Sequence, residues 1–433
     1  MQAAAQDQVR ASHLFGGLLW QRNFRLLWIG ESVSGIGNAM AVVGIPLLAV
    51  TVLRASTFAV AALTAAAYLP WLVIGLPAGA WVDRLSCRPL MIGCDVISAL
   101  LYASLPVAAW IGVLTTGQVV VVALLAGAAN VFFATAYQVY LPSLVTAAEL
   151  VEGNAKLQGS ASVATIGGRS AAGLAAQAVG DATALLFNGV SFLVSAACLL
   201  CIRTGAPPRE PAARTATVRT TTVRAEVTQG IRFVAGDPYL RPLTVYGAVA
   251  NLAYTGNLAL VVLFLVRVVG LGPAAVGLLM AAGGIGGVLG ALVAGRLTRW
   301  LGTARALLLT SALGTGLFGL LIPLTGTGPK LAYYVIGAAV VAAGIVVGNI
   351  IVGSFRQAYC PPEMLGRVGA SMRFLAFGAI PLGALLAGGL GTALGVRSAL
   401  WVILALYALS GVLLLTRGIR TRRDLPGRPA DQA

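Results

Sequence analysis

Charged residues are scarce in this chain. Asp, Glu, Lys and Arg make up 10% of its 433 residues, against about 25% in soluble domains, whereas hydrophobic residues reach 58%. So few charges cannot cover the water-exposed surface of a globular protein of this length. So many apolar residues also exclude a disordered or collagen-like chain. The composition therefore predicts an all-α membrane protein with several transmembrane helices.

Lysine, histidine and cysteine are also rare. Neither of the two lysines, Lys156 and Lys330, follows a glycine, so the G-x-x-x-x-G-K-[ST] loop is absent and we expect no ATP hydrolysis. His13 is the single histidine, and the five cysteines have no metal-binding or disulfide spacing. We predict no cofactor, no metal site and no enzymatic activity.

Long apolar runs, in contrast, fill most of the chain. A helix needs about 20 residues to cross the roughly 30 Å hydrocarbon layer. Runs of this kind occupy residues 26–52, 58–80, 90–112, 118–141, 158–179, 182–202, 243–266, 273–295, 305–325, 331–354, 368–392 and 397–416. They predict twelve transmembrane helices.

The basic residues assign an orientation to these helices. With a cytoplasmic N-terminus, 24 of the 29 Lys and Arg fall in cytoplasmic segments, as the positive-inside rule requires. Both termini are then cytoplasmic, and the chain is predicted to cross the lipid bilayer of the cell membrane many times. Because the arginines are scattered through loops and form no continuous basic face, the net charge of +16 does not indicate nucleic-acid binding.

The chain divides into two similar halves. In order, it has a cytoplasmic N-terminal segment (1–25), a six-helix half (26–202), a cytoplasmic linker (203–241), a second six-helix half (242–416) and a basic cytoplasmic tail (417–433). Arg25 and Arg241 open the halves, and Arg84 and Arg296 follow the second helix of each, at offsets of 216 and 212 residues. Such parallel repeats are typical of carriers that alternate access around a central site. The linker is interpreted either as a solvated segment near anionic headgroups or as a docking site for a partner.

A loop motif carries a family resemblance. Residues 79–88 read GAWVDRLSCR, similar to the G-x-x-x-D-R-x-G-R-[RK] signature of the major facilitator superfamily, with departures at Ser86 and Cys87. The stretches LPSL (141–144), PPEMLGRV (361–368) and PLG (381–383) resemble the bacterial exporters that include macrolide-efflux and enterobactin-exporter-like proteins. The resemblance implies the major facilitator fold, with the first, fourth, seventh and tenth helices around a central cavity.

The same resemblance implies a conformational lock on the cytoplasmic side. It would be formed by Gly79, Asp83, Arg84 and Arg88, with the Asp83 carboxylate facing the N-terminus of a helix in the other half. This lock would hold the carrier in its outward-facing state without touching the cargo.

Two carboxyl groups lie within the predicted spans. Glu31 is about 8 Å deep, where an ionised carboxylate costs a few kcal/mol unless it is paired or hydrated. It is interpreted either as a proton-coupling group or as a carboxyl still hydrated near the headgroups. Exporters that this chain resembles often have an acid at the position of Asn38, which cannot carry a proton, so proton coupling falls to Glu31 and second to Asp95. For Asp95 the alternative is a structural hydrogen-bonding role.

Arg169 is the unexpected charge of the fifth span. An arginine in the middle of a membrane helix faces the protein interior or finds a carboxylate. The resemblance implies that the first and fifth helices pack together, which makes Glu31 the obvious partner. The other interpretation is that Arg169 engages an anionic substrate, and the sequence leaves both open.

Neutral polar residues suggest a substrate cavity. Six of the eight asparagines lie inside spans, and five of those fall in the helices that the resemblance places around the cavity. Ordinary interhelical hydrogen bonding is the alternative explanation. The candidate cavity residues are Asn38, Asn130, Phe133, Tyr137, Asn251, Tyr254, Asn257 and Asn349.

These observations predict a secondary transporter, a monomer that exports amphipathic small molecules such as drugs or secondary metabolites in exchange for protons. As a mechanism, we expect protonation of Glu31 from outside to release its pairing with Arg169. Two alternatives are open: an uptake symporter for a nutrient on the same fold, and a membrane scaffold or sensor that no longer transports.

Overall fold

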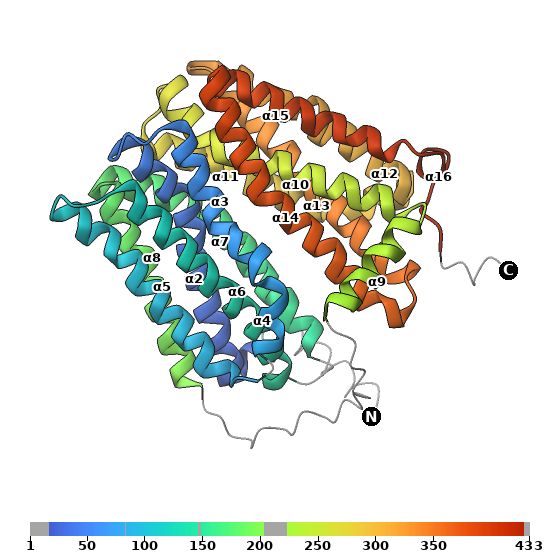
Figure 1. The fold of residues 1–433 in the computed structure, drawn as a ribbon, viewed down its shortest axis with the longest axis horizontal. Helices are drawn as coiled ribbons and strands as arrows, with labels where there is room; N and C mark the ends of the chain where they lie inside the picture. Colours follow the sequence, from blue (N-terminus) through green and yellow to red (C-terminus); the bar gives the residue numbers. More distant parts are fainter. Residues whose placement is uncertain (1–16, 83, 146–148, 203–222, 428–433) are drawn as a thin grey trace, which may run out of the picture.

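The computed structural model describes residues 17–82, 84–145, 149–202 and 223–427, and all regular elements in these ranges are helical (Figure 1). The first half contains η1 (Gly17–Trp20), α2 (Arg22–Thr51), α3 (Thr57–Val73), α4 (Gly75–Val82), α5 (Cys87–Trp110), α6 (Thr116–Leu144), α7 (Leu150–Val179) and α8 (Asp181–Cys201). The second half contains α10 (Leu240–Leu263), η2 (Phe264–Val268), α11 (Pro273–Leu301), α12 (Thr303–Thr310), η3 (Ser311–Leu317), η4 (Gly319–Leu324), η5 (Gly328–Lys330), α13 (Leu331–Tyr359), α14 (Pro362–Leu394), α15 (Val396–Ser410) and η6 (Gly411–Leu414).

The helices follow the predicted apolar runs closely. Ten helical segments of the described chain are long and apolar enough to cross a membrane. The other two predicted runs correspond to α7, which carries Glu152, Lys156 and Arg169, and to α3 with α4. Proline at position 70, which lacks an N–H donor, and Gly75, a poor helix former, flank the break between α3 and α4. The run 58–80 is therefore formed by two helices that a single residue, Ile74, separates, and its crossing of the membrane stays a prediction.

The linker contains structure that its composition did not reveal. Helix α9 (Val223–Gly236) lies inside the range 203–241, so part of this stretch is helical. Val234 at its end is buried against the second half. Asp237 then accepts hydrogen bonds from the N–H groups of Tyr239 and Leu240 at 2.9 and 2.8 Å, which satisfies two donors at the start of α10.

The two halves form two bundles that lie side by side (Figure 1). They meet chiefly along two helix pairs, α7 with α11 and α3 with α14, and α10 adds smaller contacts with α2 and α3. The described close contacts between them involve residues 166–173 of α7, 273–284 of α11, 57–72 of α3 and 378–391 of α14. These segments lie from the middle of the helices to the end where α2 finishes and α3 begins, which we call the outer end. It is the side that the charge distribution predicts to be extracellular.

The contacts at the outer end depend on small residues. A Cβ atom at Gly173 would lie 2.9 Å from the Cα atom of Gly277, and one at Gly277 would lie 2.8 Å from the Cα atom of Gly173. The backbones of α7 and α11 are therefore as close as glycine allows. Nearby, the Arg267 Nη2 atom donates to the Ala55 carbonyl oxygen at 2.6 Å and so links the two halves.

The described part of the basic tail is folded onto the second half. Helix α16 (Arg417–Arg420) is followed by an extended segment in which Asp424 accepts a hydrogen bond from the Thr303 N–H at 2.8 Å. The Leu425 N–H donates to the Thr303 hydroxyl oxygen at 2.8 Å, and the Ala304 N–H donates to the Arg423 carbonyl oxygen at 3.1 Å. The tail thus provides the N-terminal cap of α12.

Candidate transport site

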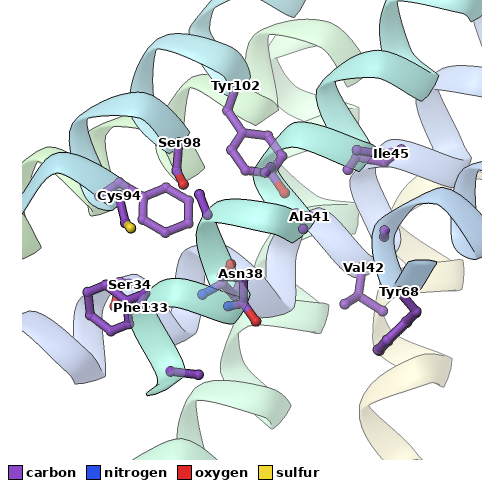
Figure 2. A pocket seen from close by; sticks show the side chains of 18 of the residues that line it. Ser34, Asn38, Ala41, Val42, Ile45, Tyr68, Cys94, Ser98, Tyr102 and Phe133 are labelled. Carbon is purple, nitrogen blue, oxygen red and sulfur yellow. The ribbon is translucent and has the colours of Figure 1, made fainter. Parts of the chain in front are cut away.

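A cavity of about 410 Å³ lies inside the first half. It is bordered by α2, α3, α5 and α6, with Phe192 of α8 at its wall, and among the described residues of the second half Leu258 of α10 alone lines it. Figure 2 shows the Asn38 side chain near the middle, with Cys94 and Phe133 on one side and Tyr68 on the other. Aromatic rings form much of the wall: those of Tyr68, Trp71, Tyr102, Phe133, Tyr137 and Phe192.

Helical spacing places these side chains on the cavity side. On α2, Glu31, Gly35, Asn38 and Val42 recur every three or four residues, so they share one face of the helix. The same spacing brings Asn130, Phe133 and Tyr137 together on α6, and Cys94, Ser98 and Tyr102 on α5. The ring of Tyr102 stacks on that of Phe192, with centroids 5.7 Å apart, which fixes one end of the wall.

Both intramembrane carboxyl groups line this cavity. Asp95 is buried, and its carboxylate accepts a hydrogen bond from the Ser195 hydroxyl. Glu31 lies close enough to Asp95 for the two to interact electrostatically. The Glu31 Oε1 and Asp95 Oδ2 atoms are buried and have no hydrogen-bond partner. Such orphan oxygens are costly in an apolar interior, because each lacks a donor that would replace its lost hydration.

The cavity unites only some of the predicted substrate residues. Asn38, Asn130, Phe133 and Tyr137 line it together with Glu31 and Asp95.

The four candidates from the second half lie elsewhere. The Asn251 Nδ2 atom donates to the Gly247 carbonyl oxygen of its own helix at 2.9 Å. Asn257 is buried, Asn349 is exposed, and Tyr254 packs against the hydrophobic core between the halves. The asparagine pattern therefore identified lining residues of the cavity in the first half, but its members in the second half do not line that cavity.

Sequence reasoning missed the aromatic residues of α3, α5 and α8. The signal was present on α3, where Thr64, Tyr68 and Trp71 repeat at helical spacing. However, the surrounding residues are also apolar, so the sequence of α3 does not show which of its faces meets a cavity.

The expected ion pair between Glu31 and Arg169 is not formed, and this prediction was wrong for the observed conformation. Arg169 lies on the side of α7 that faces α11, where its Nη1 atom donates to the Met280 carbonyl oxygen at 3.5 Å. The charge that acts on Glu31 is that of Asp95. Although α2 and α7 do pack together, the rotation of α7 directs Arg169 to the interface between the halves.

The predicted cytoplasmic lock is seen only in part. Asp83 falls outside the described residues, as does the environment of Gly79 in α4. Arg84 is exposed. Arg88 donates from Nε and Nη2 to the carbonyl oxygens of Leu199 and Leu200 at 2.9 and 2.8 Å, so it caps the C-terminus of α8 within the first half.

Metal binding has no support in the described residues. They contain no group of three or more His, Cys, Asp or Glu side chains that could hold an ion.

Most of the chain matches a known family of membrane proteins. Residues 17–430 match the family described as transmembrane secretion effector. The chain is 30% identical over 413 residues to the multidrug efflux pump Tap of Mycolicibacterium fortuitum, an alignment that covers 93% of this chain and 98% of that pump.

Solved structures share the fold at low sequence identity. A single-substitution mutant of the nucleoside transporter NupG has a TM-score of 0.75 at 11% identity, and the match covers 91% of this chain and 99% of that one. A bacterial homologue of the iron transporter ferroportin in an inward-facing state has a TM-score of 0.72 at 15% identity, covering 91% and 98%. These matches show that the chain shares the arrangement of helices of these structures.

Proposed function

We propose that this protein exports amphipathic small molecules in exchange for protons. The chain belongs to the transmembrane secretion effector family of the major facilitator superfamily, so it is a multi-pass transporter of the cell membrane and not an enzyme. The observation that carries this proposal is the aromatic cavity of the first half with Glu31 and Asp95 in its wall. The multidrug efflux activity named for its relative Tap supports the direction and the substrate class.

The finer architecture is part of the proposal. We infer twelve membrane crossings with both termini in the cytoplasm, and two moving units, residues 26–202 and 242–416, joined by the linker 203–241. The N-terminal segment 1–25 and the tail 417–433 would then lie in the cytoplasm. Contacts between the halves at the outer end support an inward-facing state, in which the opposite ends are free to admit cargo. The lock at Gly79, Asp83, Arg84 and Arg88 would close in the outward-facing state.

Protons couple to transport through the carboxyl pair. Two neighbouring carboxylates in a low-dielectric cavity repel each other, so the pair favours a state with a proton bound. A cargo that enters among the aromatic rings and offers a hydrogen-bond donor or positive charge to Glu31 competes with that proton. Release of the cargo outside and reloading of a proton would then return the carrier to the inward-facing state.

The test uses inverted vesicles energised to be acidic inside, with a pH-sensitive dye. We expect tetraphenylphosphonium, ethidium or erythromycin to dissipate the gradient in the wild type. Glu31→Gln should abolish this dissipation, and Asp95→Asn should weaken it. Glu152→Gln, which removes an acid of α7 outside the cavity, is the matched control and should behave as the wild type. Undiminished dissipation in Glu31→Gln would show that the carboxyl pair does not couple protons through Glu31.

A further inference from the structure

Arg169 has no role in the carboxyl cavity, yet it occupies the middle of a membrane helix. It lies ten residues before the end of α7. At 1.5 Å per residue this is about 15 Å from the outer end, half of the roughly 30 Å hydrocarbon thickness. Its side chain is half-buried at the interface between the halves, and its Nε atom is buried without a hydrogen-bond partner.

No carboxylate of the described chain neutralises this guanidinium. Of its five N–H donors, one has an acceptor, the Met280 carbonyl oxygen at the long distance of 3.5 Å. Glu31 and Asp95 are the two acids in the interior of the described spans, and both line the other cavity. The one acid of α7, Glu152, lies in its first turn.

Two tyrosines from further helices lie in the neighbourhood of the guanidinium, and a third lies near both of them. Tyr68 of α3 and Tyr334 of α13 are both within electrostatic range of Arg169 and of Tyr254 of α10. The phenol hydroxyls can donate hydrogen bonds to the same anion as the guanidinium. Tyr68 also lines the cavity of the first half (Figure 2), whereas Arg169 is not among its lining residues.

We propose that Arg169, with the hydroxyls of Tyr68, Tyr254 and Tyr334, forms an anion subsite that binds the carboxylate or phosphate of an amphipathic ligand between the two halves. This inference rests on the proposed transport function and assigns part of the cargo a negative charge. A planar guanidinium can hold a carboxylate through two parallel hydrogen bonds, which the single Met280 carbonyl oxygen cannot replace. The aromatic cavity that Tyr68 lines would receive the apolar body of the ligand.

Residues from both halves contribute to this subsite. Arg169 and Tyr68 belong to the first half, whereas Tyr254 and Tyr334 belong to the second. A bound anion therefore contacts both moving units and favours the conformation in which they are together. Without the anion, the buried Nε atom of this half-buried side chain has no partner to compensate the loss of its hydration.

Equilibrium binding to the purified full-length protein in neutral detergent tests the subsite without a proton gradient. The probes are 11-(dansylamino)undecanoic acid and its methyl ester, followed by dansyl fluorescence. We expect the wild type to bind the acid at least about tenfold more tightly than the ester, as a charge-assisted pair implies. Arg169→Gln should remove this difference by weakening binding of the acid alone, and Arg169→Lys should retain part of it. Arg305→Gln, which removes an exposed arginine of α12, is the control.

Several outcomes separate the possibilities. Equal binding of acid and ester to the wild type would overturn the proposal, and so would an equal loss of both probes in Arg169→Gln with an unchanged melting temperature. If Arg169→Gln does not fold, the proposal is tested by the ratio of acid to ester affinity in Arg169→Lys and in the wild type. Competition by phosphatidylglycerol supports the subsite with a lipid phosphate as occupant, whereas acid selectivity without such competition supports a soluble amphiphile. Failure of Glu31-dependent proton coupling leaves these binding ratios unchanged, so the two proposals fail separately.

Discussion

Closure of the outer end depends on the contact between Gly173 and Gly277, and substitution by alanine should open it. A Cβ atom at Gly173 would lie 2.9 Å from both the N and Cα atoms of Gly277. Because carbon atoms prefer about 3.5–4.0 Å, α7 and α11 must separate by roughly 0.5–1 Å. Overpacking of this kind costs about 1–3 kcal/mol, which disfavours the closed outer end by roughly 5- to 150-fold.

Double electron–electron resonance measures this shift. Spin labels at Val113 and Thr327, exposed residues at the outer ends of the two halves, report their separation. In a background without native cysteines, Gly173→Ala should shift the distance distribution to longer values.

Two control substitutions separate the contact from the helix propensity of alanine. A Cβ atom at Gly167 of α7 or at Gly295 of α11 would meet nothing within 4 Å. Both controls gain the same propensity, about 1 kcal/mol, and should leave the distances as in the wild type. A distribution for Gly173→Ala that matches the wild type and both controls would refute the view that this contact closes the outer end.

Two capping carboxylates give further predictions. Asp237→Ala removes the acceptor for two N–H groups at the start of α10 and for the Tyr359 hydroxyl at 2.8 Å. It should lower the free energy of unfolding, measured by urea denaturation in detergent, by about 1–3 kcal/mol. Asp424→Ala removes the cap that the tail supplies to Thr303, so trypsin should cleave the tail faster than in the wild type, and an unchanged cleavage rate would show that the cap does not retain it.

The sequence predicted the helices well because long apolar runs leave the backbone one way to satisfy its hydrogen bonds in a bilayer. The twelve runs correspond to helices or nearly continuous helical segments of similar bounds, and the break after Val73 is one that the sequence did not predict. The local signals for that break, Pro70 and Gly75, also occur inside unbroken membrane helices, so they did not decide it. The range 203–241 lacked an apolar run, which concealed α9.

The site was harder to predict because it depends on how the helices are rotated against one another. Glu31, Asn38 and Asn130 could be found because polar residues in apolar spans are conspicuous. The partner of Arg169 could not be found from the sequence, because a rotation of α7 of less than half a turn decides whether the Arg169 guanidinium faces α2 or α11. That rotation is set by packing at small residues such as Gly168 and Gly173, whose neighbours lie far away in sequence.

The position of the cavity within one half has a thermodynamic consequence. Since Leu258 alone lines the cavity among the described residues of the second half, a rigid rotation of the halves changes access to the cavity but leaves its walls almost intact. Cargo held there would then have nearly the same dissociation constant on either side of the membrane. Pumping against a concentration gradient requires those constants to differ, and a cavity that does not deform can meet that requirement only through a change in its own charge.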